Sequence, residues 1–331
     1  MVERGSDAGG VGEGPGTGTP GPGGGRTSYG SDRATGTPGR LDYGRSPGFW
    51  QSRSAIDQQN RSVVLSDEVP PCVTEWLTRR IVSRRIRSLA RRGPFDRLLD
   101  IGRGVGNWTV ALAGLRREAV AVDFCEEFVR ATRKRALEAG IAGLDVRRLD
   151  WRCEGVEGTF DLVTMGAVTM YVADEDMEAL AARLRGLARP GGILYLRSTT
   201  HRGATLYNVL GDYQAIYRPE DYYPGLLEAH GFRALEARRV AENSYQGLIE
   251  SYLALGRALL PARWAPTAER GAFAAARATW PLSLWLALRL KRPFRPPRLE
   301  SWEYVFERCA GGISAAETPG RSPRSPEPGR A

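Results

Sequence analysis

Three glycines at alternate positions follow a carboxylate in one short segment of this chain, where residues 100–106 read Asp-Ile-Gly-Arg-Gly-Val-Gly. An apolar run including Leu98 and Leu99 precedes the segment, and a helical repeat of apolar residues begins after it at Trp108. This pattern predicts a buried strand, a tight turn and a helix. Glycines allow backbone N–H groups to approach a ligand at a helix N-terminus, where negative charge is favoured. A nucleotide-type ligand is therefore the first hypothesis.

The spacing of the glycines distinguishes between kinds of nucleotide. The dinucleotide fingerprint Gly-x-Gly-x-x-Gly would place its third glycine at position 107, which is Asn107. Further apolar strands follow at regular distances, and the first two of them end in Asp123 and Asp150. The segment 160–166 predicts the next strand, and 187–196 reads as a helix end, a Pro-Gly-Gly turn and a fifth strand.

In order and spacing these segments resemble the successive motifs of the class I S-adenosylmethionine (SAM)-dependent methyltransferases. The resemblance covers about residues 95–240, with an extension to 308. It implies an α/β fold with a Rossmann-like, doubly wound seven-stranded sheet and SAM as cofactor. It also implies a set of cofactor-binding residues: Asp100, Gly102, Gly104, Gly106, Asp123, Phe124, Asp150, Trp151 and Met165.

The resemblance gives each of these residues a role. The three glycines would approach the methionyl part of SAM, with Asp100 ordering the turn or meeting its ammonium group. Asp123 would bind the ribose hydroxyls. The adenine would lie between Phe124 and Met165, with Asp150 accepting from its amino group and Trp151 supplying a backbone donor or a ring face. Arg103 stands where the family usually has a small residue, and a side chain directed to solvent would leave the loop unchanged.

The chemical class of the methyl acceptor is inferred mainly by excluding classes whose signatures are missing. The Pro-Pro signature of amino methyltransferases that act on adenine or glutamine does not follow the fourth strand, and a Pro-Cys nucleophile is also missing. Thr199 and Thr200 stand where a catechol-type metal site would need its acidic pair, so no metal is expected. We therefore expect an O or N acceptor on a small molecule or a glycan-type substrate.

A neutral hydroxyl loses its proton as it is methylated, so a base near the acceptor would help. The chain has two histidines, and His201 follows the fifth strand on the carboxyl edge, where open α/β sheets bind ligands. Tyr171, after the fourth strand, is a weaker candidate. His201 and Tyr171 are accordingly the predicted catalytic residues.

Composition limits the remaining possibilities. The chain has 331 residues and a formal net charge of +9, but almost all of its basic residues are arginines, as expected from a GC-rich coding bias. Nucleic acid is disfavoured as a partner. The four cysteines lack metal-ligand spacing, and no apolar run is long enough to span a membrane, so a cytoplasmic protein is expected. No oligomeric state is predicted.

The chain divides into six predicted parts. A Gly- and Pro-rich disordered tail occupies 1–48, a helical lid segment 49–94 and the SAM-binding core 95–240. A helical insertion between strands six and seven occupies 241–299, the last core strand 300–311 and a second disordered tail 312–331.

Two alternatives to a small-molecule enzyme remain. The apolar and then basic stretch 280–298 suggests contact with a membrane interface and a lipid acceptor, although a helix buried against the core is the favoured interpretation. The second alternative is a methyltransferase-fold protein that binds SAM without catalysis.

Overall fold

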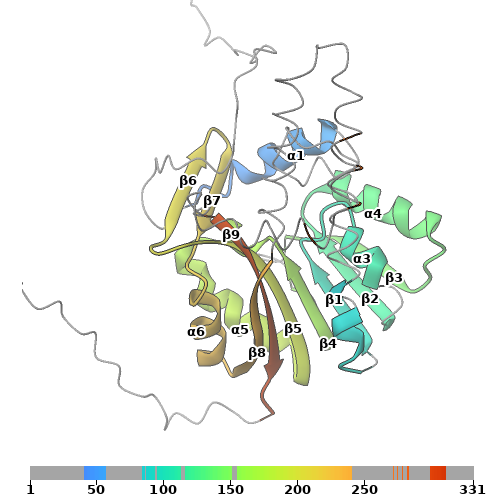
Figure 1. The fold of residues 1–331 in the computed structure, drawn as a ribbon. Helices are drawn as coiled ribbons and strands as arrows, with labels where there is room; N and C mark the ends of the chain where they lie inside the picture. The colour runs from blue at the N-terminus through green and yellow to red at the C-terminus, as the bar shows by residue number, and fades with distance from the viewer. Residues whose placement is uncertain are drawn as a thin grey trace, which may run out of the picture.

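In the computed structural model, a seven-stranded mixed sheet forms the centre of the fold (Figure 1). The structure describes residues 41–56, 84–85, 87–93, 95–112, 116–150, 155–240 and 299–310, together with residues 271, 274, 278 and 282. Residues 1–40 of the first predicted tail, the whole of 312–331, Trp151, most of the predicted insertion and all of 280–298 except Leu282 lie outside this part. Residues 41–48, which were also assigned to the first tail, are described: Leu41 is buried and helix α1 begins at Ser46.

The strands follow the order β3-β2-β1-β4-β5-β9-β8 across the sheet. Their bounds are β1 Phe95–Ile101, β2 Arg116–Asp123, β3 Leu144–Arg148, β4 Phe160–Gly166, β5 Ala188–His201, β8 Phe232–Val240 and β9 Leu299–Arg308. The first five are parallel, and β9 lies antiparallel between β5 and β8. The predicted seven-stranded, Rossmann-like sheet is therefore confirmed.

The central parallel strands are buried on both faces, which explains why they read as continuous apolar runs. In β4 six of the seven residues are buried. Helices α5 (Met177–Leu187) and α6 (Tyr222–Ala229) pack on one face through residues such as Leu180, Leu184 and Leu227. On the other face, Leu89 and α4 (Glu126–Glu138) contact the sheet, with Val129 of α4 against Ala121. The sheet is thus doubly wound, as predicted.

The chain leaves the parallel core in two places that matter for the site. Helix α1 (Ser46–Ile56) lies above the carboxyl ends of the parallel strands (Figure 1). A hairpin of β6 (Leu206–Leu210) and β7 (Tyr213–Tyr217) is inserted between β5 and α6. The sequence analysis did not predict this hairpin, although its two-residue Gly211-Asp212 connection between apolar strands is a hairpin signature.

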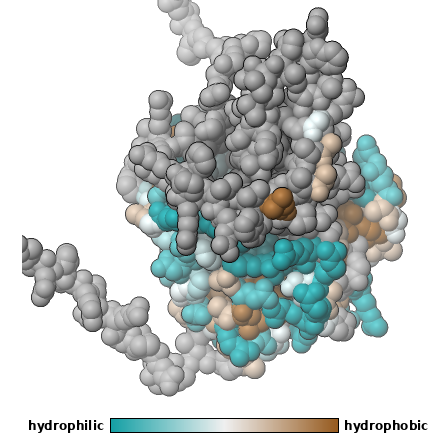
Figure 2. Space-filling model, in the orientation of Figure 1, coloured by the Kyte–Doolittle hydropathy of each residue, from teal (hydrophilic) through white to brown (hydrophobic). Residues whose placement is uncertain are grey.

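The described surface is mainly polar over the lower part of the sheet (Figure 2). Among the described residues, only Leu137 and Leu282 are large apolar side chains with high exposure. Within the same part of the chain, no helix combines the length and apolar character needed to cross a bilayer.

Candidate functional site

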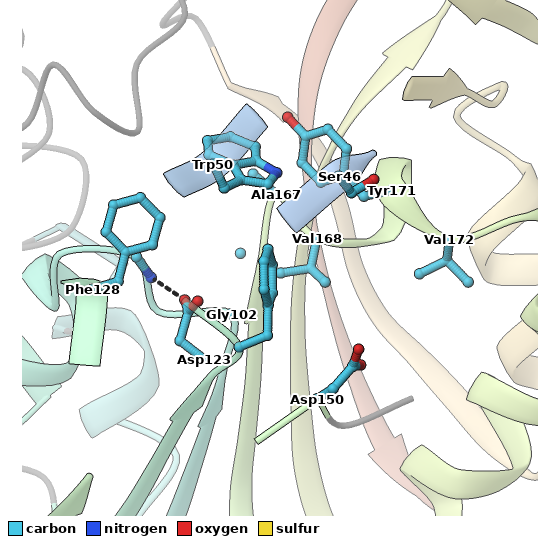
Figure 3. A pocket seen from close by; sticks show the side chains of 13 residues that line it. Ser46, Trp50, Gly102, Asp123, Phe128, Asp150, Ala167, Val168, Tyr171 and Val172 are labelled. Atoms are coloured by element: carbon cyan, nitrogen blue, oxygen red, sulfur yellow. Dashed lines mark hydrogen bonds between the residues drawn. The ribbon is translucent and has the colours of Figure 1, made fainter. Parts of the chain in front are cut away.

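A cavity opens at the carboxyl edge of the parallel strands, where β1 and β4 lie side by side. At this point the strand order reverses direction, and open α/β sheets bind ligands at such switch points. Figure 3 shows the residues that line it. They are Ser46, Trp50, Gly102, Gly104, Asp123, Phe124, Phe128, Asp150, Gly166, Ala167, Val168, Tyr171 and Val172.

The glycine loop forms the floor of this cavity. Gly102, Gly104 and Gly106 all have left-handed backbone conformations, with φ of 65°, 53° and 80°. A Cβ added to Gly102 would lie 2.1 Å from the Val168 side chain, so a larger residue cannot fit at this point. Gly106 instead packs against Thr132 of α4, where an added Cβ would meet the hydroxyl oxygen at 2.6 Å. Gly102 and Gly104 line the cavity, whereas Gly106 permits the packing of two helices.

Asp123 closes the end of β2 and is the best-placed carboxylate for a ligand. Its Oδ2 accepts a hydrogen bond from the Gly104 amide and its Oδ1 one from the Cys125 amide, both at 3.0 Å. Burial raises the pKa of Asp123 to about 6, and the charge of Arg103 and these two amides oppose that rise. Because each carboxylate oxygen has two lone pairs, both oxygens can still accept from ligand hydroxyls.

Asp100 lies behind the loop and does not line the cavity. Its Oδ1 accepts from the Thr164 hydroxyl at 2.7 Å, and its Oδ2 accepts from the Thr109 hydroxyl. Burial raises the pKa of Asp100 above its usual range, while the two hydroxyls and Arg103 oppose the rise. Asp100 therefore links β1, β4 and α3 (Asn107–Ala111) beneath the loop. Of the two roles that the resemblance implies for Asp100, these contacts correspond to ordering the turn rather than to meeting the ammonium group of SAM.

The Arg103 side chain does not point to solvent, the direction that would leave the loop unchanged. It is 6% exposed, and its Nη1 donates to the Ala121 carbonyl of β2 at 2.7 Å. Nε and Nη2 are buried without a hydrogen-bond partner. Burial lowers the pKa of Arg103 to about 10, partly offset by the negative charges of Asp123 and Asp100. Arg103 therefore takes part in the packing of the loop against β2.

The predicted adenine-binding residues are only partly brought together. Phe124 and Asp150 both line the cavity, and both also line a neighbouring hollow beside α4. Met165, in contrast, is fully buried in the hydrophobic core under α5 and does not line the cavity. The alternation of β4 directs Met165 into the core, so the wall here is formed by Gly166, Ala167 and Val168. Met165 is thus a core residue in this structure.

The turn after β4 adopts a strained conformation at the cavity wall. Ala167 has φ of 57°, the one positive value found for a residue other than glycine in the described ranges. Its amide donates to the Arg197 carbonyl of β5 at 2.8 Å, which holds the turn against the sheet edge. Such strain persists only where surrounding contacts fix it, and it is typical of ligand sites.

Aromatic side chains line the upper part of the cavity, with Phe128 above Asp123 and with Trp50 and Tyr171 further from it (Figure 3). Trp50 of α1 makes edge contacts with Phe128 of α4 and Tyr171, at ring-centroid distances of 6.3 and 5.3 Å. Tyr171 belongs to the short helix η3 (Thr169–Tyr171), and its ring also contacts Tyr213 of the hairpin at 6.1 Å. Ser46, Phe128, Val168 and Val172 had not been predicted as site residues.

Of the two predicted catalytic residues, the structure places only Tyr171 in the cavity lining. Tyr171 lines the cavity, but burial raises its pKa well above its usual range, so its hydroxyl stays protonated. His201 lies outside the cavity lining, and its Nδ1 is 2.6 Å from the Ala204 carbonyl of its own turn. Strand β5 continues four residues beyond Arg197, which pairs with the last residue of β4. His201 therefore lies about 13 Å further along the strand, and the structure does not bring it to the cavity.

A fully buried arginine holds the loop that carries Tyr171. Arg218, just after β7, donates from Nη1 to the Thr169 carbonyl at 3.0 Å and from Nη2 to the Val172 carbonyl at 2.7 Å. Its Nε and Nη2 also contact Asp174 Oδ1 at 2.9 and 2.6 Å. The unpredicted hairpin thus positions the wall of the cavity.

SAM carries a positive sulfonium and ribose hydroxyls, and the lining residues suit both. Asp123 and Asp150 supply carboxylates, the thirteen lining residues include no lysine or arginine, and aromatic rings stabilise cations at close range. Gly102 and Gly104 line the cavity without presenting a side chain to it. Among the described residues no cluster of metal-ligating side chains is present.

Comparison with known proteins gives a consistent result. Residues 98–192 match the family model described as a methyltransferase domain. Cypemycin N-terminal methyltransferase from a Streptomyces species is 29% identical over 180 residues, covering 52% of this chain and 67% of that protein. Ubiquinone biosynthesis O-methyltransferase from Xanthomonas campestris pv. campestris (strain B100) is 33% identical over 116 residues, covering 33% of this chain and 45% of that protein. The chain thus spans about half to two thirds of the length of these curated relatives.

A solved structure shares the fold. The 1,6-didemethyltoxoflavin-N1-methyltransferase of Burkholderia thailandensis, solved with bound 1,6-didemethyltoxoflavin and S-adenosylhomocysteine (SAH), superposes with a TM-score of 0.53. The match covers 83% of this chain and 94% of that one, at 14% identity. Residues 98–192 are therefore a methyltransferase domain, and over this domain the chain is similar to SAM-dependent methyltransferases.

Proposed function

We propose that the protein binds SAM and transfers its methyl group to an oxygen or nitrogen atom of a small molecule or a glycan-type substrate. The observation that carries this proposal is the cavity at the switch point, where the left-handed glycine loop and the buried carboxylate of Asp123 meet. The matched relatives support the proposal, because their names describe both an N-terminal methyltransferase and an O-methyltransferase.

When bound, SAM supplies a methyl group on a sulfonium, so its leaving group is already activated. The task of the chain is then to position the two reactants and exclude water. Asp123 would accept from the ribose hydroxyls while the Gly104 amide fixes its orientation. Phe124 and Asp150 would hold the adenine end, where they share the neighbouring hollow.

The acceptor would enter on the aromatic side of the cavity. Trp50, Phe128 and Tyr171 would shield it from water, and the protonated Tyr171 hydroxyl would orient it as a neutral hydrogen-bond partner. In this proposal Tyr171 is a binding residue and no proton is transferred to it. We further propose small molecules as the acceptor class, no nucleic-acid substrate and a cytoplasmic location.

A transfer assay with radiolabelled methyl tests the proposal. The full chain is incubated with labelled SAM and panels of small hydroxyl, amine, carboxylate and glycan acceptors, and the Asp123→Ala variant is run in parallel. Asp145→Ala is the matched control, because Asp145 is an exposed aspartate on β3 outside the cavity lining. We expect transfer by the wild type and the control but none by Asp123→Ala. Binding of SAM without transfer to any acceptor class would instead favour the non-catalytic alternative.

A further inference from the structure

The charged side chain of Arg103 is buried near the cavity, and its desolvation carries a high free-energy cost. It is 6% exposed, and only one of its three guanidinium nitrogens has a hydrogen-bond partner, the Ala121 carbonyl. A buried charge is retained only where its surroundings compensate it. The single bond to Ala121 does not satisfy the donors of this group, so the compensation must come from nearby charges.

Two buried carboxylates provide that compensation. Asp123 and Asp100 lie on either side of the loop that carries Arg103, and they are the largest charge interactions of its guanidinium. Arg103 forms no hydrogen bond to either carboxylate, so its charge acts through space in a poorly solvated region. On the far side, Glu126 of α4 adds a weaker attraction and Arg133 a weaker repulsion.

Asp123 needs such a charge more than Asp100 does. Asp100 is held by two neutral hydroxyls and serves the fold in either protonation state. Asp123 faces the cavity, where it must accept from the Gly104 and Cys125 amides and from a ligand. Burial and the negative charge of Asp100 both oppose the ionisation of Asp123, and Arg103 is the main charge that favours it.

We propose that Arg103 is a positioning residue that keeps Asp123 ionised, and thereby keeps its carboxylate fixed on the Gly104 amide and ready to bind a cofactor at neutral pH. The nature of the ligand rests on the proposed function, whereas the electrostatic coupling does not. The competing explanation is that Arg103 merely anchors the loop to β2 through its bond to the Ala121 carbonyl.

A titration of the ligand-free protein separates these explanations. The Gly104 amide donates directly to Asp123, so its ¹H–¹⁵N NMR shift reports the protonation of that carboxylate. Wild type is expected to show a midpoint near pH 6. In Arg103→Met, which keeps an unbranched apolar side chain but removes the charge, the midpoint moves up by about 1 to 2 pH units. Arg103→Lys restores the midpoint, because it keeps the charge.

Other titratable groups surround this reporter, and the design must separate them from Asp123. They are Asp100 of β1, Asp150 after β3, and Cys125 and Glu126 at the start of α4. Burial raises the pKa of the Cys125 thiol to about 11, well above the range of the titration. The Asp123→Asn variant identifies the contribution of Asp123, because the transition near pH 6 disappears in that variant.

The affinity for SAH gives a second readout. With a midpoint raised by about 1.5 units, Arg103→Met binds SAH about eightfold more weakly than wild type at pH 6.5 and within about twofold at pH 9. In an Asp123→Asn background, Arg103→Met causes no further pH-dependent loss. A merely structural role predicts the same loss at every pH, so a constant ratio between the two proteins overturns the inference. An unchanged Gly104 midpoint in Arg103→Met also overturns it, whether or not SAH binds. Failure of wild type to bind SAH, with the midpoint shift present, contradicts only the proposed function.

Discussion

Replacement of Gly102 by alanine tests the close approach of Gly102 to Val168 at the floor of the cavity. Gly102 has φ of 65°, and its added Cβ would lie 2.1 Å from Cγ2 of Val168. The left-handed backbone costs an alanine about 1–2 kcal/mol. Overpacking against Val168 adds about 1–3 kcal/mol. We therefore expect Gly102→Ala to lower the free energy of unfolding by about 2–5 kcal/mol.

Gly140 supplies a matched control. It follows α4 with φ of 64°, and an added Cβ there meets nothing within 4 Å. Gly140→Ala should thus lower the free energy of unfolding only by the cost of the left-handed backbone, about 1–2 kcal/mol. Replacing glycine also reduces the entropy of the unfolded chain, and this stabilising effect is the same in both variants. The difference between the two losses measures the close approach to Val168.

Urea unfolding followed by circular dichroism measures these losses, and SAH titration measures the effect on the cavity. We expect weakened SAH binding in Gly102→Ala and unchanged binding in Gly140→Ala. Val168→Ala removes the clashing methyl group, so the Gly102→Ala/Val168→Ala double variant should recover most of the excess loss. Equal losses for Gly102→Ala and Gly140→Ala would refute the claimed steric constraint.

Three further predictions concern residues around the cavity. Arg218→Met removes the buried cation that binds Asp174 Oδ1 and the carbonyls of Thr169 and Val172, and should lower the free energy of unfolding by about 3 kcal/mol. Urea unfolding should show a loss below about 1 kcal/mol for the exposed control Arg202→Met, and equal losses would contradict the proposed role of Arg218. Because burial raises the pKa of Asp123 from 3.8 to about 6, the folded state binds more protons than the unfolded state between these values. The contribution of Asp123 to the free energy of unfolding is thus present below about pH 4 and falls by about 3 kcal/mol as the pH rises through 6. It is measured as the difference in free energy of unfolding between the wild type and Asp123→Asn, and a difference that does not change with pH would count against this assignment. His201→Ala should leave the rate of labelled methyl transfer unchanged, and a tenfold loss of that rate would return His201 to the site.

Sequence reasoning worked best where the signal is local. The glycine loop, the acid that ends β2, the acid that follows β3 and the apolar strands are each specified by a few neighbouring residues, and the sheet order follows from their succession. The glycine that follows α4, Gly140, has positive φ and is likewise a local signal for the end of a helix. The glycine loop, Asp123 and Asp150 are the features that the structure places around the cavity.

The errors arose where tertiary structure decides. The position of His201 depends on how far β5 extends past β4, and the direction of Met165 depends on the pleat of β4 within a sheet buried on both faces. The burial of Arg103 depends on the path of the left-handed loop over β2. The hairpin and Arg218 were missed although the Gly211-Asp212 connection carried a local signal.

Calorimetric titration of SAH into the wild type and Asp123→Ala tests the central claim most directly. The cavity at the carboxyl edge is expected to bind SAH through the carboxylate of Asp123, so the wild type should bind and Asp123→Ala should lose most of that affinity. Asp145→Ala should bind like the wild type. Equal affinity of Asp123→Ala and wild type, or the absence of binding by the wild type, would contradict the account.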